Sequence, residues 1–133
     1  MADLDIKNLT RQHLKVRAGL SFAKVTEEVL PGWDISLVFV GPTKALELNK
    51  KLRGKSYIPN VLSYKVGNKS GEIFICLSEA SKQASNFNLA PSTFHLYLFI
   101  HGLLHLKGWA HGAKMKQCEQ KLLAHVTKNS NRH

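Results

Sequence analysis

The chain is 133 residues long, 44% hydrophobic and 21% charged, which indicates one folded domain over residues 1–133 and excludes a disordered chain. Its formal net charge of +10 favours polyanionic partners such as nucleic acid, although solubility alone could account for it. No apolar stretch is long enough to span a membrane, and the isolated Cys76 and Cys118 argue against a disulfide framework, so we expect a cytoplasmic protein.

The N-terminal part is predicted to alternate strands and helices. A short strand at residues 4–9 precedes an amphipathic helix at residues 11–30. Residues 35–40 are β-branched and apolar, which is typical of a buried strand. A second helix should then begin near Pro42 and end at Gly54.

The middle of the chain is predicted to form a hairpin from strands at residues 61–66 and 72–77, joined by a loop with two glycines. A short helix at residues 78–87 follows, capped by Ser78. The chain closes with a helix at residues 114–126 and a polar tail, residues 128–133, that we expect to fray.

Between these segments lies a helix that begins near Pro91 and runs to Leu106, and it is apolar on nearly every side. Such a helix is expected to be buried all round. Together the elements predict an α+β fold, a small mixed four-stranded sheet packed with about five helices, with this helix at its centre. Cys76 and Cys118 lie in apolar segments and should be buried and unreactive.

Histidines interrupt this buried helix. His101 and His105 are four residues apart, so both rings project from one face. A left-handed helix end at Gly108 would let His111 turn back toward the pair. Three neutral imidazoles with an open fourth position describe a catalytic zinc site, so we expect one Zn²⁺ per chain with a bound water.

The alternative is that these are ordinary core or surface histidines whose rings form hydrogen bonds with backbone carbonyls. Their spacing on an apolar helix disfavours this alternative. His95 points about 120° away from His101 around the helix and should not touch the metal. The remaining histidines are expected to be exposed: His13, His125 and His133. Zinc proteases use the same spacing with a glutamate after the first histidine as general base, but Gly102 stands there, which disfavours peptide hydrolysis.

The segment HGLLHLKGWAH, residues 101–111, resembles the signature of the YbeY family of bacterial zinc-dependent endoribonucleases and ribosomal RNA maturation factors. Three further blocks resemble that family in the same order: LNKKLRGK at 48–55, NVLSY at 60–64 and GEIFICLSEA at 71–80. The resemblance covers most of the chain from about residue 46 to residue 123. It implies that His101, His105 and His111 bind zinc and that Arg53 is a functional arginine.

The resemblance also implies cleavage of single-stranded RNA, with ribosomal RNA as substrate and the small ribosomal subunit as partner. Arg53 would stabilise charge on the phosphate, while the three histidines hold zinc and its water in a cleft between the buried helix and the Arg53 segment. Three lysines flank Arg53 and could form an RNA-binding wall or only a solvated face: Lys50, Lys51 and Lys55.

Two features depart from the family pattern. Ala110 stands where relatives usually carry an acidic residue, so an anchor for the ligands is missing. Residues 56–59 replace the usual acidic residue and threonine. These departures leave open a non-catalytic RNA-binding ribosome assembly factor with a structural zinc, which a fourth protein ligand would favour. Glu72 stands where the family carries an acidic residue, and it could form a salt bridge at the end of a strand or have a catalytic role.

Overall fold

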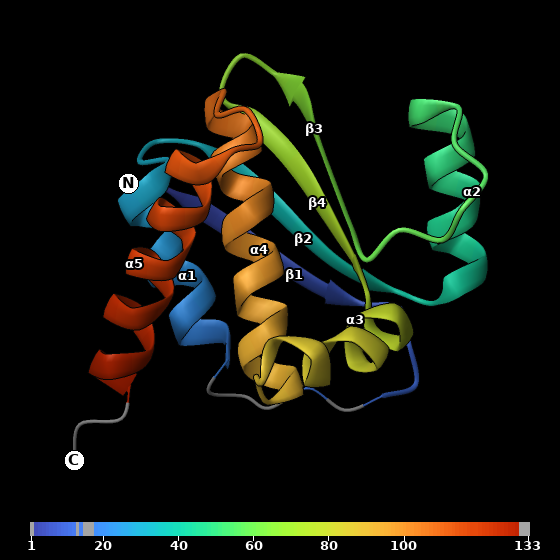
Figure 1. The fold of residues 1–133 in the computed structure, drawn as a ribbon. Helices are drawn as coiled ribbons and strands as arrows, with labels where there is room; N and C mark the ends of the chain where they lie inside the picture. Colours follow the sequence, from blue (N-terminus) through green and yellow to red (C-terminus); the bar gives the residue numbers. More distant parts are fainter. Residues whose placement is uncertain (1, 13, 15–17, 131–133) are drawn as a thin grey trace.

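The computed structural model describes residues 2–12, 14 and 18–130. Within them it has the α+β fold expected from the sequence (Figure 1). The strands are β1 (Asp3–Asn8), β2 (Asp34–Val40), β3 (Val61–Gly67) and β4 (Ser70–Cys76). The helices are α1 (Ala18–Val29), α2 (Pro42–Arg53), α3 (Leu77–Ala84), the short 3-10 helix η1 (Ser85–Phe87), α4 (Pro91–Lys107) and α5 (Ala113–Ser130).

The strands form one mixed sheet in the order β1-β2-β4-β3. β1 pairs with β2 and β2 with β4 in parallel, whereas β3 and β4 form the predicted antiparallel hairpin. The second hairpin strand begins at Ser70 and ends at Cys76, so it starts and ends earlier than predicted. The register of the hairpin shifts between Lys65 and Gly67, next to the turn.

Two apolar layers cover the sheet, because successive side chains of a strand point to opposite faces. On β2, Leu37 and Phe39 join the larger core formed with α1, α4 and α5, while Val38 and Val40 join a smaller core with α2. Figure 1 shows α4 running across the sheet beside α1 and α5, with α2 set apart from them. α4 is therefore buried between the sheet and the other helices.

The segment before α1 differs from the prediction. β1 begins at Asp3, and α1 begins at Ala18, although a helix was expected from residue 11; residues 13 and 15–17 lie outside the described part of the chain. Asn8 and Thr10 explain the late start. The Thr10 backbone N–H donates to Asn8 Oδ1 at 3.0 Å, and the Gln12 N–H donates to Thr10 Oγ1 at 3.2 Å. These side chains stabilise a turn in place of a helix.

The predicted cap at Ser78 is wrong. β4 leads directly into α3, whose first residue is the buried Leu77, so Cys76 occupies the capping position and Ser78 lies inside the helix. Burial of Leu77 in the core fixes the chain at this point and outweighs the capping preference of serine. α3 ends at Ala84, and η1 completes the predicted segment.

The C-terminal helix also differs from the prediction. α5 continues to Ser130, so residues 128–130 of the expected frayed tail are helical, while residues 131–133 lie outside the described part. Cys76 is buried as predicted, but Cys118 on α5 is only partly buried. No helix in the described ranges combines the length and apolar character that a membrane span requires.

Candidate metal centre

α4 positions the first two histidines of the site. The helix is buried on several sides through its apolar residues. Pro91 occupies its first turn, where the backbone N–H that proline lacks has no hydrogen-bond partner within the helix in any case. His101 and His105 are only partly buried and open from the helix toward β3 and the segment before it. Gly102, between them, faces the sheet, where an added Cβ would lie 3.1 Å from side-chain atoms of Ile73. A protease-type glutamate at this position would therefore point into the core.

The end of α4 brings in the third histidine. Gly108 adopts the left-handed conformation, with φ 106° and ψ 7°. Its N–H donates to the His105 carbonyl, and the Trp109 N–H donates to the Leu104 carbonyl, both at 3.0 Å. The chain reverses here, and the exposed ring of His111 returns toward the pair, as the sequence predicts.

The three rings face one another closely. Ring centroids are 4.4 Å apart for His101 and His105, 5.0 Å for His101 and His111, and 4.3 Å for His105 and His111. One nitrogen of each ring lies within 4.8 Å of the others, so the group could hold one metal ion. In the described part of the chain no further histidine, cysteine or carboxylate joins this group.

The donor set and its electrostatics suit a divalent cation such as zinc. Burial lowers the pKa of His105, and the neighbouring rings of His101 and His111 lower it further. A neutral imidazole is the form that binds a metal. Three imidazoles leave one position of a tetrahedral zinc for water or substrate, as in catalytic zinc sites. The residues present therefore fit the predicted ion.

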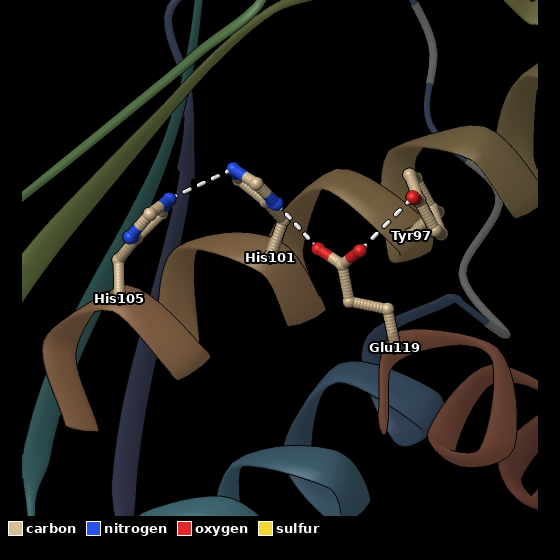
Figure 2. A network of polar contacts seen from close by, with 4 residues as sticks. All are labelled: Tyr97, His101, His105 and Glu119. Atoms are coloured by element: carbon tan, nitrogen blue, oxygen red, sulfur yellow. Dashed lines mark hydrogen bonds and ion pairs between the residues drawn. The ribbon is translucent and has the colours of Figure 1, made fainter. Parts of the chain in front are cut away.

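A buried carboxylate supports the site from α5. Glu119 is only 3% exposed. The ring of His101 donates from Nδ1 to Glu119 Oε2, and the Tyr97 hydroxyl donates to Glu119 Oε1 at 3.0 Å, as Figure 2 shows. Since the proton is held on Nδ1, the other nitrogen, Nε2, is left with a lone pair toward the cluster, where it lies 2.9 Å from Nε2 of His105.

Glu119 was not predicted from the sequence, although its position on α5 carries a signal. On α5, Met115, Leu122 and Val126 pack into the core, and Glu119 occupies the same apolar stripe. A carboxylate on such a stripe needs a buried partner, which here is the pair of Tyr97 and His101. Burial and Glu119 together raise the pKa of Tyr97 to about 12, so its hydroxyl keeps its proton. Glu119 thus supplies the kind of anchor that Ala110 lacks.

A cavity of about 570 Å³ opens in front of the histidines. All three histidines line one side, and Arg53, residues 57–63 and Gln83 line the rest. Arg53 is the last residue of α2, and its guanidinium donates to the Tyr57 hydroxyl at 3.2 Å. The buried Asn49 fixes this wall, because its side-chain amide donates to the Tyr57 carbonyl at 2.9 Å. The structure therefore places Arg53 in one cleft with the histidines.

The three lysines near Arg53 lie elsewhere on the surface. Lys50, Lys51 and Lys55 are exposed, and none of them lines the cavity. Glu72, for which a strand-end salt bridge and a catalytic role were both left open, also lies outside the cavity and accepts a hydrogen bond from the Tyr64 hydroxyl across the hairpin. These residues are therefore separate from the histidine cluster.

The other histidines are placed as follows. His95 is buried against Phe39, with ring centroids 6.0 Å apart, and is not part of the metal-capable group. His125 is exposed, as predicted, and its Nε2 lies 3.0 Å from a carboxylate oxygen of Glu28. His13 and His133 fall outside the described residues.

Comparisons with known proteins agree with these features. A model of the family "Endoribonuclease YbeY" matches residues 3–129. The protein of that name from Stenotrophomonas maltophilia is 29% identical over 129 residues, which cover 82% of this chain and 80% of the relative. The protein of that name from Thermodesulfovibrio yellowstonii is 37% identical over 108 residues, which cover 69% of this chain and 66% of the relative. The one from Spiroplasma citri is 33% identical over 91 residues, which cover 59% of this chain and 58% of the relative. The match therefore spans little more than half of that relative's length.

A known solution structure of a Thermotoga maritima protein has the same fold. It superposes with a TM-score of 0.68, covers 95% of this chain and 90% of its own, and is 22% identical in sequence. The fold is thus shared, and the family model extends over nearly the whole sequence, the histidine cluster and Arg53 included. The chain therefore belongs to the YbeY endoribonuclease family.

Proposed function

We propose that the protein is a zinc-dependent endoribonuclease that cleaves single-stranded RNA in the cytoplasm, as a single domain. The observation that carries this proposal is the placement of Arg53 across one cleft from three convergent histidines. A site of this kind combines metal ligands with a guanidinium that matches a phosphate group. The relatives named above are endoribonucleases by name, which makes RNA the expected phosphodiester substrate.

His101, His105 and His111 would hold the zinc, one ion per chain. When bound there, zinc supplies a Lewis acid and lowers the pKa of water that it coordinates. Glu119 keeps a proton on Nδ1 of His101 and so keeps that ring aimed into the cleft. Arg53, oriented by Tyr57, would bind the phosphate and stabilise the negative charge that grows on it during cleavage.

The basic surface beyond the cleft would bind the rest of the RNA. Lys50, Lys51 and Lys55 lie on the same segment as Arg53 but outside the cavity, where they can contact phosphates away from the reacting one. The net charge of +10 would raise the rate and strength of RNA association in the same way.

Ribosomal RNA is the substrate that we infer, and maturation of the small ribosomal subunit is the process. The resemblance of residues 101–111 and of the preceding blocks to ribosomal RNA maturation factors supports this inference. The rival role, an assembly factor with a structural zinc, calls for a fourth protein ligand. The described part of the chain offers three, which favours the catalytic role.

The test is a cleavage assay with zinc-loaded protein and a labelled single-stranded fragment of ribosomal RNA. We expect cleavage by the wild type and by the control variant His125→Ala, which removes an exposed histidine that does not line the cleft. His101→Ala and Arg53→Ala should lose most of it while keeping the circular dichroism spectrum of the wild type. The same fragment annealed to its complement should be cut far more slowly. Equal cleavage by all variants, or none by the wild type, would overturn the proposal.

A further inference from the structure

A second cavity adjoins the histidine cluster on the side away from Arg53. It has a volume of about 470 Å³ and lies among β3, η1, α4 and α5. The two cavities share four lining residues, which include His101 and His111. Any polymer whose reacting group sits at the histidines can therefore extend directly into this second cavity.

Aromatic rings form one side of this cavity. Phe87, Phe94 and Tyr97 pack together, with ring centroids of Phe87 at 4.9 Å from Phe94 and 5.9 Å from Tyr97. Phe94 and Tyr97 are held by α4, so they give the cluster a fixed support. Phe87, however, is 49% exposed and presents free ring surface at the edge of the cavity.

An exposed phenylalanine supported by the buried ring of Phe94 and the partly buried ring of Tyr97 offers a flat apolar surface, and a nucleobase is the part of RNA that stacks on such a surface. The volume falls within the range of small-molecule sites. Stacking needs no particular hydrogen-bond pattern, so this surface would accept different bases.

The polar groups around the cavity fit a nucleotide. Lys116 of α5 is exposed on its rim and can pair with a phosphate. Glu119 is the carboxylate in the lining, but its two oxygens already accept from His101 and Tyr97. The carboxylate is buried behind these partners, so the exposed charge at the rim is positive. That charge complements a phosphodiester chain and argues against an acidic peptide side chain as the occupant.

We propose that this second cavity is a base-binding subsite, in which the base of a nucleotide next to the reacting phosphate stacks on Phe87 while Lys116 contacts the adjoining phosphate. The inference rests on the proposed function for the identity of the polymer, RNA. It adds a contact on the far side of the histidines from Arg53, so that the RNA strand is held on both sides of the bond to be cut.

The test uses two probes that contain no internucleotide bond, adenosine 5′-monophosphate and ribose 5-phosphate, titrated into the zinc-loaded, isotope-labelled protein by NMR. Both probes carry the phosphate, so the ratio of their dissociation constants isolates the base. We expect the nucleotide to bind at least about tenfold more tightly, a ratio set by one stacked base. Amide signals of η1, which carries Phe87, should shift with the nucleotide and not with the sugar phosphate, whereas those at the start of α5, near Lys116, should shift with both probes.

Variants assign the effect to Phe87. Phe87→Ala should bring the ratio close to one, whereas Phe87→Tyr, which keeps the ring face, should preserve it. Val66→Ala removes a similarly exposed apolar side chain on β3 that does not line the cavity, and it should leave the ratio unchanged. An equal affinity of wild type for the two probes, or a ratio that Phe87→Ala leaves intact, would overturn the subsite.

The subsite and the proposed function fail separately. If the wild type cleaves RNA but does not distinguish the two probes, the endoribonuclease proposal stands and the subsite is wrong. If it prefers the nucleotide through Phe87 but does not cleave RNA, the subsite stands as a nucleotide-binding site and the cleavage proposal is wrong.

Discussion

The ring of His101 on α4 and the carboxylate of Glu119 on α5 form a hydrogen-bonded pair beneath the histidine cluster. The pair joins two helices through the very side chain that is expected to bind zinc. Tyr97 completes the arrangement by donating its hydroxyl proton to the second oxygen of Glu119. The packing of α5 against α4 is therefore coupled to the geometry of the site.

Replacing Glu119 should weaken zinc binding while the fold remains. In Glu119→Gln the side chain keeps its size but loses the charge that strengthens the hydrogen bond from His101, so we expect zinc affinity to fall about tenfold or more. Competition against a chromophoric chelator measures this affinity directly. Tyr97→Phe should have a smaller effect, because it leaves the contact with His101 in place. An unchanged affinity in Glu119→Gln would show that the carboxylate does not support the ligand.

Arg53 should matter far more than its basic neighbours for the cleavage step. We expect Arg53→Ala to lower kcat/KM for single-stranded RNA by roughly a hundredfold, because a charged donor at the phosphate is lost. Lys51→Ala, on the same helix but outside the cavity, should lose severalfold at most and mainly through KM. Steady-state kinetics at one fixed salt concentration separates the two. Similar losses in both variants would contradict a distinct role for Arg53.

His95 should make the protein less stable in mild acid. Burial lowers the pKa of His95 below its ordinary value of 6.5, and Nε2 of the ring is buried without a hydrogen-bond partner. Below pH 6.5 the histidine of the unfolded chain therefore binds a proton that the folded chain binds less readily. The contribution of His95 to the free energy of unfolding is fully present above pH 6.5 and is lost as the pH falls toward the pKa of His95 in the folded protein. This group contributes a slope of at most about 1.4 kcal/mol per pH unit.

Urea unfolding of the metal-free protein between pH 7 and pH 5 measures this slope. His95→Phe, which can still pack against Phe39, should reduce it, whereas His125→Phe, at an exposed position, should reduce it much less. Equal slopes in wild type and His95→Phe would contradict the assignment to His95.

Gly108 should be required for the turn that brings His111 to the cluster. Its φ of 106° lies in a region that a residue with a Cβ adopts only with strain. We expect Gly108→Ala to cost about 1–2 kcal/mol of unfolding free energy and to weaken zinc binding, because relief of the strain moves His111. Lys107→Ala, at the neighbouring exposed position, serves as the control. Thermal unfolding together with chelator competition checks both effects.

Much of the site could be predicted from sequence because it depends on local geometry. The spacing of His101 and His105 fixes their common helix face, and Gly108 ends the helix in the conformation that glycine favours. The buried strands and the hairpin follow equally from apolar runs and turn residues. These features require only neighbouring residues to be known.

The parts that were missed depend on contacts between distant segments. Glu119 meets His101 only because α5 packs on α4, and a pattern within α5 marks the residue as unusual without naming its partner. Leu77 is drawn into the core by the sheet, which removes Ser78 from the capping position. The hydrogen bonds of Asn8 with residues that follow it likewise delay the start of α1.

Zinc-dependent cleavage is tested most directly by a zinc titration of the metal-free protein, with the initial rate of cleavage of a single-stranded ribosomal RNA fragment as the readout. We expect no cleavage without metal and a cleavage rate that rises linearly until one zinc ion is present per chain and then stays constant. His111→Ala should remove this response, since it takes away one of the three proposed ligands. Cleavage that is equally fast without zinc, or zinc binding at one ion per chain with no cleavage at any ratio, would contradict a zinc-dependent endoribonuclease.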